Sequence, residues 1–153
     1  MMTIKALYEL LDVSASRFPD NIAIEEAETG SMSYAELARL SDRLRDRLRE
    51  MGVGLGDRVG ICMRKSGDAI ASIFGIMKAG AAYVPTDPTA PASRNAYIFH
   101  NCAVKVIIVE SHLADRLGEE FKQVDFAPAM IVIDRVGACE VGGRRTVVRH
   151  RAS

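Results

Sequence analysis

Two short runs of apolar, mostly β-branched residues constrain the fold of this chain most. The run at 105–109 reads Lys-Val-Ile-Ile-Val, and the run at 130–134 reads Met-Ile-Val-Ile-Asp. Runs without polar alternation are typical of strands buried on both faces of a parallel sheet. Between Asp57 and Asp134, predicted strands alternate with segments of helical periodicity, so we expect right-handed crossovers. The sequence therefore predicts an α/β fold with a mostly parallel, doubly wound sheet and flanking helices.

The other elements follow from periodicity, capping residues and turn residues. Helices are expected over 3–18, 33–51, 66–78, 92–101 and 111–121, strands over 22–24, 58–63 and 82–84, and turns over 28–31 and 52–57. Ser66 and Ser111 are expected to cap the helices that follow them. The strand at 82–84 is expected to be buried. The core-facing residues of the 66–78 helix are expected to be Ile70, Ile73, Phe74 and Met77.

The helix after Ser33 has the clearest start signal. Ser33 and Glu36 fit a capping box, in which each side chain accepts a hydrogen bond from the backbone amide of the other residue. Met32 and Leu37 occupy the positions of the accompanying hydrophobic staple. An apolar stripe then continues through Leu37, Leu40, Leu44, Leu48 and Met51. This face of the helix is predicted to be core.

The glycine-rich segment 52–57 is a candidate phosphate loop. A nucleotide-binding loop follows a strand and opens a helix. This segment instead follows a predicted helix and precedes a predicted strand. We therefore interpret it as a helix stop and a tight turn.

Length and charge limit the classes of protein and partner. The 153 residues are enough for one ordinary domain, and 20 basic residues balance 20 acidic ones. This balance argues against nucleic acid or an anionic membrane as the main partner. Glu9 and Asp12 interrupt the region where a signal peptide needs an apolar core. Cys62, Cys102 and Cys139 form neither a zinc pattern nor a disulfide framework, so we expect a cytoplasmic protein.

Few residues qualify as site candidates. Lys78 is a possible catalytic lysine, but its place at a helix end beside Gly80 favours a structural role. Tyr83 and Asp87 are possible cleft residues, although a buried tyrosine and a turn aspartate are the more common roles. The histidines, which lack ligand spacing, are His100, His112 and His150. We therefore assign no catalytic, cofactor-binding or metal-binding residue.

The segment from Lys78 to Pro88, Lys-Ala-Gly-Ala-Ala-Tyr-Val-Pro-Thr-Asp-Pro, resembles a signature of amino-acid adenylation domains. These are the ATP-using modules of nonribosomal peptide synthetases. Further similar parts are the block 32–37, the turn 52–57 followed by Val59, the residues Pro91, Arg94 and Tyr97, and the strand 105–109. Met32 and Thr86 depart mildly from the family pattern. The resemblance covers roughly Ala6 to Asp134.

The resemblance implies an incomplete N-terminal subdomain of the adenylate-forming fold at 1–134. The arginine-rich composition and missing apolar periodicity of 135–153 predict a basic, mobile tail. Family members use ATP and Mg to form an acyl-adenylate and pass the acyl group to a carrier thiol. Their phosphate loop, ribose-binding aspartate and catalytic lysine have no counterpart here. Lys65-Ser66-Gly67 and Gly142-Gly143-Arg144 are too short and misplaced. We therefore expect no bound cofactor and no activity from this chain alone.

Three interpretations remain open. The chain is a truncated adenylation domain or half of a split one, a non-enzymatic module that docks on a synthetase, or a separate nucleotide-binding domain with its cleft at the strand ends. The expected partners are the rest of an adenylation domain, a synthetase or a second copy. Self-association is expected through unpaired strands at 106–109 and 131–133. Residues 146–148 are a candidate edge strand within the tail.

Overall fold

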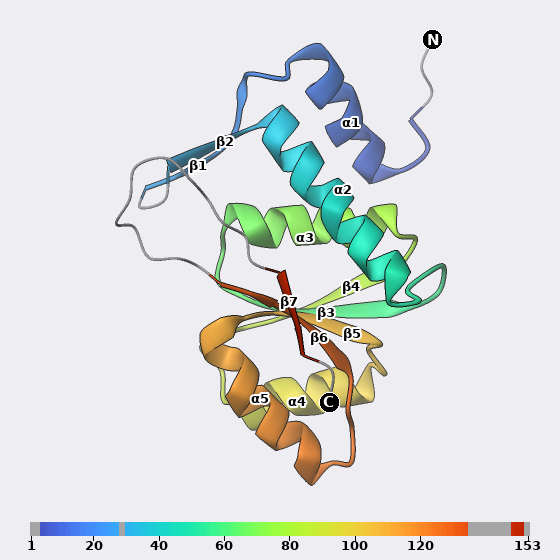
Figure 1. Ribbon diagram of the computed structural model, residues 1–153, viewed down its shortest axis with the longest axis vertical. Coiled ribbons are helices and arrows are strands. Elements are labelled where there is room, and N and C mark those ends of the chain that lie inside the picture. Colours follow the sequence, from blue (N-terminus) through green and yellow to red (C-terminus); the bar gives the residue numbers. More distant parts are fainter. Residues whose placement is uncertain (1–3, 28–29, 135–147, 152–153) are drawn as a thin grey trace.

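The computed structural model describes residues 4–27, 30–134 and 148–151 (Figure 1). In chain order the elements are α1 (Leu7–Arg17), β1 (Ile22–Glu26), β2 (Gly30–Ser33), α2 (Tyr34–Glu50), β3 (Arg58–Cys62), α3 (Gly67–Lys78), β4 (Ala82–Thr86), α4 (Ala92–Asn101), β5 (Val106–Glu110), α5 (Ser111–Gln123), β6 (Ala129–Ile133) and β7 (Val148–Arg151). Within these described ranges, no helix is long and apolar enough to cross a membrane.

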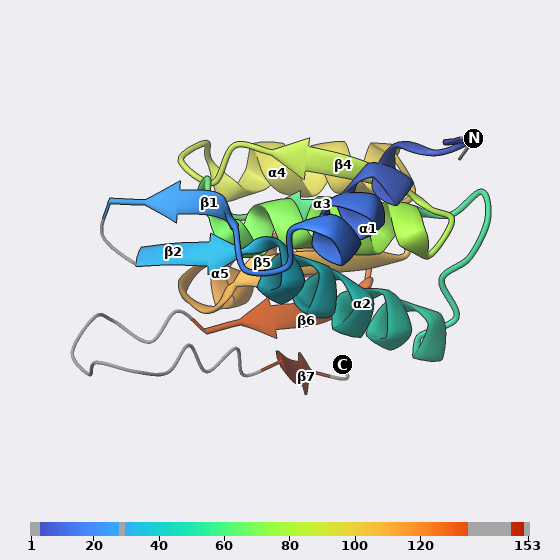
Figure 2. The same cartoon turned by 90° about the horizontal axis from the view of Figure 1, so that it is seen from above.

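A five-stranded sheet in the order β4-β3-β5-β6-β7 forms the centre of the molecule. The strands β4, β3, β5 and β6 are parallel, and β7 runs antiparallel to β6. Helices α1, α2 and α3 lie on one side of the sheet, and α4 and α5 lie on the other (Figure 1). The strands β1 and β2 form a separate antiparallel pair, seen beside α2 in Figure 2. The predicted mostly parallel α/β sheet with helices on both faces is confirmed.

The core has two parts because successive residues of a strand point to opposite faces of the sheet. All five residues of β5 are buried. Val106 and Ile108 belong to the cluster under α1, α2 and α3, whereas Ile107 and Val109 belong to the cluster under α4 and α5. The continuous apolar run predicted this two-sided burial correctly.

The start of α2 also agrees with the sequence. The amide of Glu36 donates to Ser33 Oγ at 3.2 Å, and the amide of Ser33 donates to Glu36 Oε2 at 2.8 Å. Met32 and Leu37 are buried in the same cluster. The predicted stripe is also buried at Leu40, Leu44 and Leu48, while Met51 is partly buried against it.

Several predicted boundaries are wrong. The first helix begins at Leu7, after an extended Ala6, and not at residue 3. The segment expected to be a turn at 28–31 includes the start of β2, which forms a hairpin with β1 in which Glu26 is the partner of Gly30. Ser111 does not cap α5. It is the first helical residue, and Glu110 occupies the cap position without a side-chain hydrogen bond.

The buried face of α3 also differs from the prediction. Ile70 is exposed and Met77 is half-buried, while Gly75 and Ile76 lie in the core. A Cβ built on Gly75 would lie 2.8 Å from Leu44 Cβ and 2.9 Å from a backbone oxygen of α2. The two helices approach so closely that position 75 requires glycine. Ile73 and Phe74 are partly buried against the core, so the prediction holds for these two residues.

The strand β4 is exposed, although 82–84 was expected to be buried. It is the outermost strand and pairs with β3 alone. Ala82, Tyr83 and Pro85 are exposed. A proline is tolerated at a sheet edge because no neighbour requires its missing amide donor. The prediction that Tyr83 is buried is also wrong, because Tyr83 lies on this edge strand.

Candidate functional site

The carboxyl ends of the paired strands β3 and β5 carry a group of polar side chains. The chain leaves β3 for α3 on one face of the sheet and leaves β5 for α5 on the other face (Figure 1). In open α/β sheets, ligands bind in the crevice that forms where the connections after two neighbouring strands run to opposite faces of the sheet. The side chains at these strand ends are therefore the first candidates for a site.

Glu110, the last residue of β5, is a buried acid in this crevice. Only 2% of the residue is exposed, and Oε1 accepts a hydrogen bond from the Arg64 amide at 2.9 Å. Oε2 lies 3.5 Å from Arg64 Nε and 3.4 Å from His112 Nδ1. These distances suit ionic contacts but are too long for strong hydrogen bonds. The cluster joins the ends of β3 and β5.

The N-terminus of α3 already holds an anion from the chain itself. Ser66 Oγ accepts from the Ala69 amide at 3.1 Å, as predicted for a cap. The Gly67 amide donates to Glu26 Oε1 at 2.5 Å. Backbone amides at a helix N-terminus attract anions, including phosphate. Here the carboxylate of Glu26, brought by β1, takes that position, so the segment 65–67 is not an open phosphate loop.

The loop after β4 is ordered by Asp87. Its Oδ1 accepts from Thr89 Oγ1 at 2.7 Å and from the Thr89 amide at 2.8 Å. The Thr89 hydroxyl, followed by the amide, lowers the pKa of the Asp87 carboxyl below its usual range. The backbone oxygen of Asp87 accepts from Asn95 Nδ2 at 2.9 Å. Asp87 therefore has the predicted role of a turn aspartate and orients the start of α4.

A cavity of about 370 Å³ lies between this loop and α5. Its lining residues are Cys62, Pro88, Thr89, Ala90, Pro91, Ala92, Asn95, Leu113, Arg116 and Leu117. Burial raises the pKa of the Cys62 thiol, which therefore stays protonated at neutral pH. Asn95 Oδ1 is buried and has no hydrogen-bond partner within the part of the chain that the structure describes.

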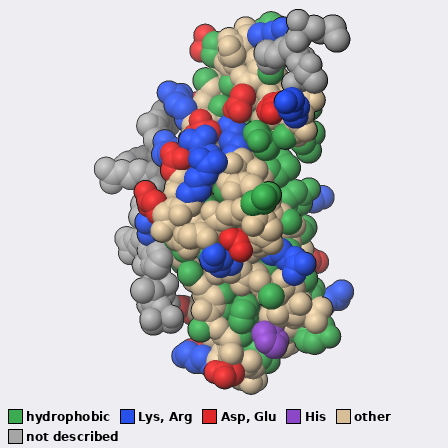
Figure 3. Space-filling view, turned by 90° about the vertical axis from the view of Figure 1, so that its right-hand side faces the viewer, with side chains coloured by type: hydrophobic (Ala, Val, Ile, Leu, Met, Phe, Trp, Pro, Cys, Tyr) green, Lys and Arg blue, Asp and Glu red, His purple; other side chains and the backbone are tan. Residues whose placement is uncertain are grey.

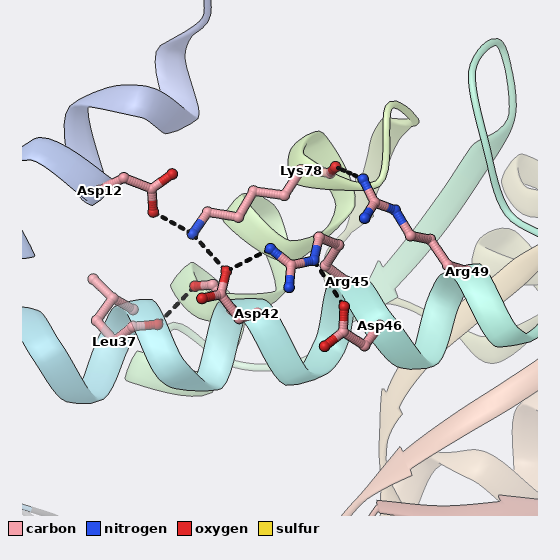
Figure 4. A network of polar contacts seen from close by, with 8 residues as sticks. Asp12, Leu37, Asp42, Arg45, Asp46, Arg49 and Lys78 are labelled. Atoms are coloured by element: carbon pink, nitrogen blue, oxygen red, sulfur yellow. Dashed lines mark hydrogen bonds and ion pairs between the residues drawn. The ribbon is translucent and has the colours of Figure 1, made fainter.

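Lys78 lies far from the crevice, at the opposite end of α3. An α-helix of 12 residues separates its ends by about 16 Å. Lys78 Nζ donates to Asp12 Oδ1 at 2.5 Å and to Asp42 Oδ1 at 2.8 Å, and 3% of its side chain is exposed (Figure 4). Arg45 also contacts Asp42 at 3.0 Å. Lys78 therefore joins α1, α2 and α3, which supports a structural role.

The remaining candidates do not come together. His100 stacks at a tilt on Phe126, with ring centroids 5.1 Å apart, and His112 belongs to the Glu110 cluster. His150 lies on β7, and its side chain is outside the description, as are Cys139 and the segment 142–144. Among the residues that are described, no group of three or more His, Cys, Asp or Glu could hold a metal ion.

Sequence reasoning missed the residues that shape the crevice and the cavity. Glu110 carried a usable signal, because a charged residue directly after a buried apolar run marks a strand end. Asn95 and Arg116 lie on two different helices, and no local pattern connects them. Only the packing of α4 beside α5 brings them to one cavity.

Comparisons with known proteins give a consistent result. A family model described as AMP-binding enzyme matches residues 11–147. Tyrocidine synthase 2 of Brevibacillus parabrevis is 34% identical over 125 residues, which cover 82% of this chain and 4% of that protein. Bacitracin synthase 1 of Bacillus licheniformis is 40% identical over 116 residues, which cover 76% of this chain and 2% of that protein.

A solved structure of the nonribosomal peptide synthetase FmoA3 is 33% identical, with a TM-score of 0.71. The match covers 84% of this chain and 13% of the FmoA3 chain. Another FmoA3 structure holds α-methyl-L-serine-AMP. The chain thus spans a small part of the length of the proteins that it matches.

Proposed function

The chain belongs to the AMP-binding enzyme family, and from this premise we propose that it is the N-terminal part of a peptide-synthetase adenylation domain. The complete domain would activate an amino acid with ATP and Mg, and would pass the aminoacyl group to a carrier-protein thiol. The observation that carries the proposal is the identity of 34% and 40% to two peptide synthetases, over 82% and 76% of the chain.

The part of the chain described here does not fit the phosphates of ATP. Glu26 fills the amide position at the start of α3. The glycine-rich segment 52–57 precedes β3, so it lies at the amino end of the sheet, away from the strand-end crevice. A buried acid, Glu110, stands at the crevice itself. We therefore propose that the 153 residues alone are inactive.

The contribution of this chain to the complete domain would be a scaffold. Lys78 and its carboxylate partners hold the three helices on one face together. Gly80, with a φ of +87°, allows the sharp turn from α3 into β4. Lys78 and Gly80 lie within the 78–88 signature, and their contacts and backbone geometry support a structural role for these two residues.

An exchange assay tests both halves of the proposal. The pure chain should give no amino-acid-dependent ATP–pyrophosphate exchange above a heat-killed control with any of the twenty amino acids. The scaffold role is tested with a chimera in which this chain replaces the aligned segment of FmoA3. The chimera should catalyse ATP–pyrophosphate exchange that depends on α-methyl-L-serine. Exchange by the isolated chain would refute the inactivity. A folded but inactive chimera would refute the scaffold role.

One observation favours the alternative, an interaction module without enzymatic activity. The strand β7 pairs with the outer edge of β6, so residues from the tail region cover that edge. Val148 of the predicted 146–148 strand belongs to β7, and residues 146 and 147 lie outside the description. A module would fold cooperatively as a monomer, and deletion of 148–151 would lower its melting temperature. An unchanged melting temperature would remove this support.

A further inference from the structure

The cavity between the β4–α4 loop and α5 has the features of a small-molecule site. Its volume of about 370 Å³ falls in the range of ligand pockets, which are mostly apolar with a few placed polar groups. Proline and leucine side chains supply apolar walls: Pro88, Pro91, Leu113 and Leu117. The cavity also adjoins the carboxyl end of β3, the side of an open α/β sheet where ligands bind.

Asn95 supplies an oriented acceptor. Its Nδ2 donates to the backbone oxygen of Asp87 at 2.9 Å, and that oxygen can only accept, so the orientation of the amide is fixed. Its Oδ1 therefore points away from this bond and has no donor among the described residues. Asn95 is 3% exposed, and a buried carbonyl without a partner is unfavourable. A ligand with an N–H or O–H group would satisfy it.

Arg116 supplies a cation at the same cavity. It is exposed on α5 and forms no ion pair or hydrogen bond with any other described residue. A guanidinium presents its donors in a planar fork that matches a carboxylate. The cavity thus combines apolar walls, one acceptor that lacks a donor, and one cation that lacks an anion.

We propose that this cavity binds a small aliphatic carboxylic acid that also carries a hydroxyl or amide donor. The aliphatic part packs between the prolines of the loop and the leucines of α5. The donor bonds to Asn95 Oδ1, and the carboxylate pairs with Arg116. This site needs no residue outside the chain, so it does not depend on the proposed function.

The test is a titration of the full chain followed by amide shifts in ¹H–¹⁵N NMR spectra. The probe is 2-hydroxy-4-methylpentanoate, compared with 4-methylpentanoate, which lacks the hydroxyl, and with 2-hydroxy-4-methylpentanamide, which lacks the charge. The complete probe should shift amides at 88–92, 95 and 113–117 in a saturable manner, and each reduced probe should bind at least several-fold more weakly.

Arg116→Gln should weaken the complete probe by about tenfold to a hundredfold, as expected for loss of a charged hydrogen-bonding partner. Arg39→Gln, on the exposed side of α2, is the matched control and should leave the affinity unchanged. The proposal is overturned if no saturable shifts occur up to about 10 mM probe. Equal weakening by both substitutions, or equal shifts with inorganic phosphate, would also overturn it, and so would retained affinity without the hydroxyl.

Discussion

Lys78 is buried, and ion pairs with Asp12 and Asp42 stabilise its ammonium group there. Its side chain is 3% exposed, whereas those of Asp12 and Asp42 are 51% and 41% exposed. Removing one partner of a buried ion pair lowers the free energy of unfolding more than removing one partner of an exposed pair, because the remaining charge stays buried. Loss of a carboxylate therefore leaves the buried Lys78 charge less well compensated, whereas loss of Lys78 leaves only two partly exposed carboxylates.

We predict that Asp42→Asn lowers the free energy of unfolding by about 1–3 kcal/mol in urea melts. The loss should shrink in a Lys78→Met background, where no buried cation remains to be neutralised. Asp46→Asn is the control. Asp46 pairs with Arg45 at 2.9 Å but does not contact Lys78 in the structure, so its replacement should matter little. Identical losses at Asp42 and Asp46 would contradict the burial of Lys78.

Cys62 provides a pH-dependent prediction at the same scale. Burial raises the pKa of its thiol above the ordinary value of 9.0. The stability linked to the protonated thiol is therefore complete below about pH 9 and is lost as the pH rises through the folded-state value. Cys62→Ala should reduce the loss of stability above about pH 9.

The burial of Cys62 also predicts slow chemical modification. In a Cys139→Ser background, we expect a thiol reagent to modify half-buried Cys102 faster than Cys62. Equal rates of modification would show that Cys62 is accessible.

At the scale of elements, the contact between α2 and α3 determines the residue at Gly75. A Cβ there would meet Leu44 and a backbone oxygen at less than 3 Å, and backbone cannot move aside as a flexible side chain can. Gly118 offers the opposite case. It lies within α5, and its Cβ would meet only Met130 Cε at 4.0 Å. The same substitution therefore has opposite consequences at the two sites.

Gly75→Ala should destabilise the protein by up to about 2 kcal/mol, because overpacking costs about 1–3 kcal/mol against a helix-propensity gain of nearly 1 kcal/mol. Gly118→Ala should stabilise it by about 0.5–1 kcal/mol through that same gain. Thermal and urea melts of the two variants measure the difference. A stabilising alanine at position 75 would mean that α2 and α3 are further apart than described.

The capping box makes a second prediction for the elements. Ser33→Ala should cost about 1 kcal/mol, since the Glu36 amide loses its acceptor. Glu36→Ala should be less than additive with it, because both side chains serve the same helix end. A double-mutant cycle in urea gives the coupling. Strict additivity would show that the two hydrogen bonds act separately.

At the scale of the whole molecule, the surfaces open to association differ from those expected. The strand 106–109 is central, and the strand containing 131–133 has a neighbour on each side. They are therefore not free edges, and the expectation that these strands are unpaired is wrong. Leu7, Leu10 and Phe18 are instead exposed, and only Leu11 of α1 is buried. On the face in Figure 3, charges of both signs intermingle, and apolar side chains gather toward one margin.

If the chain self-associates, we predict that α1 is responsible. A Leu7→Lys and Leu10→Lys double substitution should lower the mass measured by light scattering behind a sizing column. Leu55→Lys is the control, because Leu55 is 95% exposed but lies alone on the 52–57 turn. A fall in mass with Leu55→Lys, or an unchanged mass with the double substitution, would contradict this assignment.

The sequence by itself determined the features that depend on neighbouring residues. The Ser33 box needs two residues three positions apart, and the two-sided burial of β5 follows from one continuous apolar run. The alternation of strands and helices was sufficient to predict the mostly parallel, doubly wound sheet. The family resemblance came from short motifs of the same kind. These signals are local, so no strand order is needed to interpret them.

Only the tertiary structure decided the position of β4 at an edge, the narrow α2–α3 contact at Gly75, and the partners of Lys78. Asp12 and Lys78 are 66 residues apart, and Asn95 and Arg116 line one cavity from two different helices. Whether a strand is an edge depends on the order of all strands, and the buried face of a helix depends on what packs against it. Such contacts are fixed by long-range packing, for which a single sequence carries no local signal.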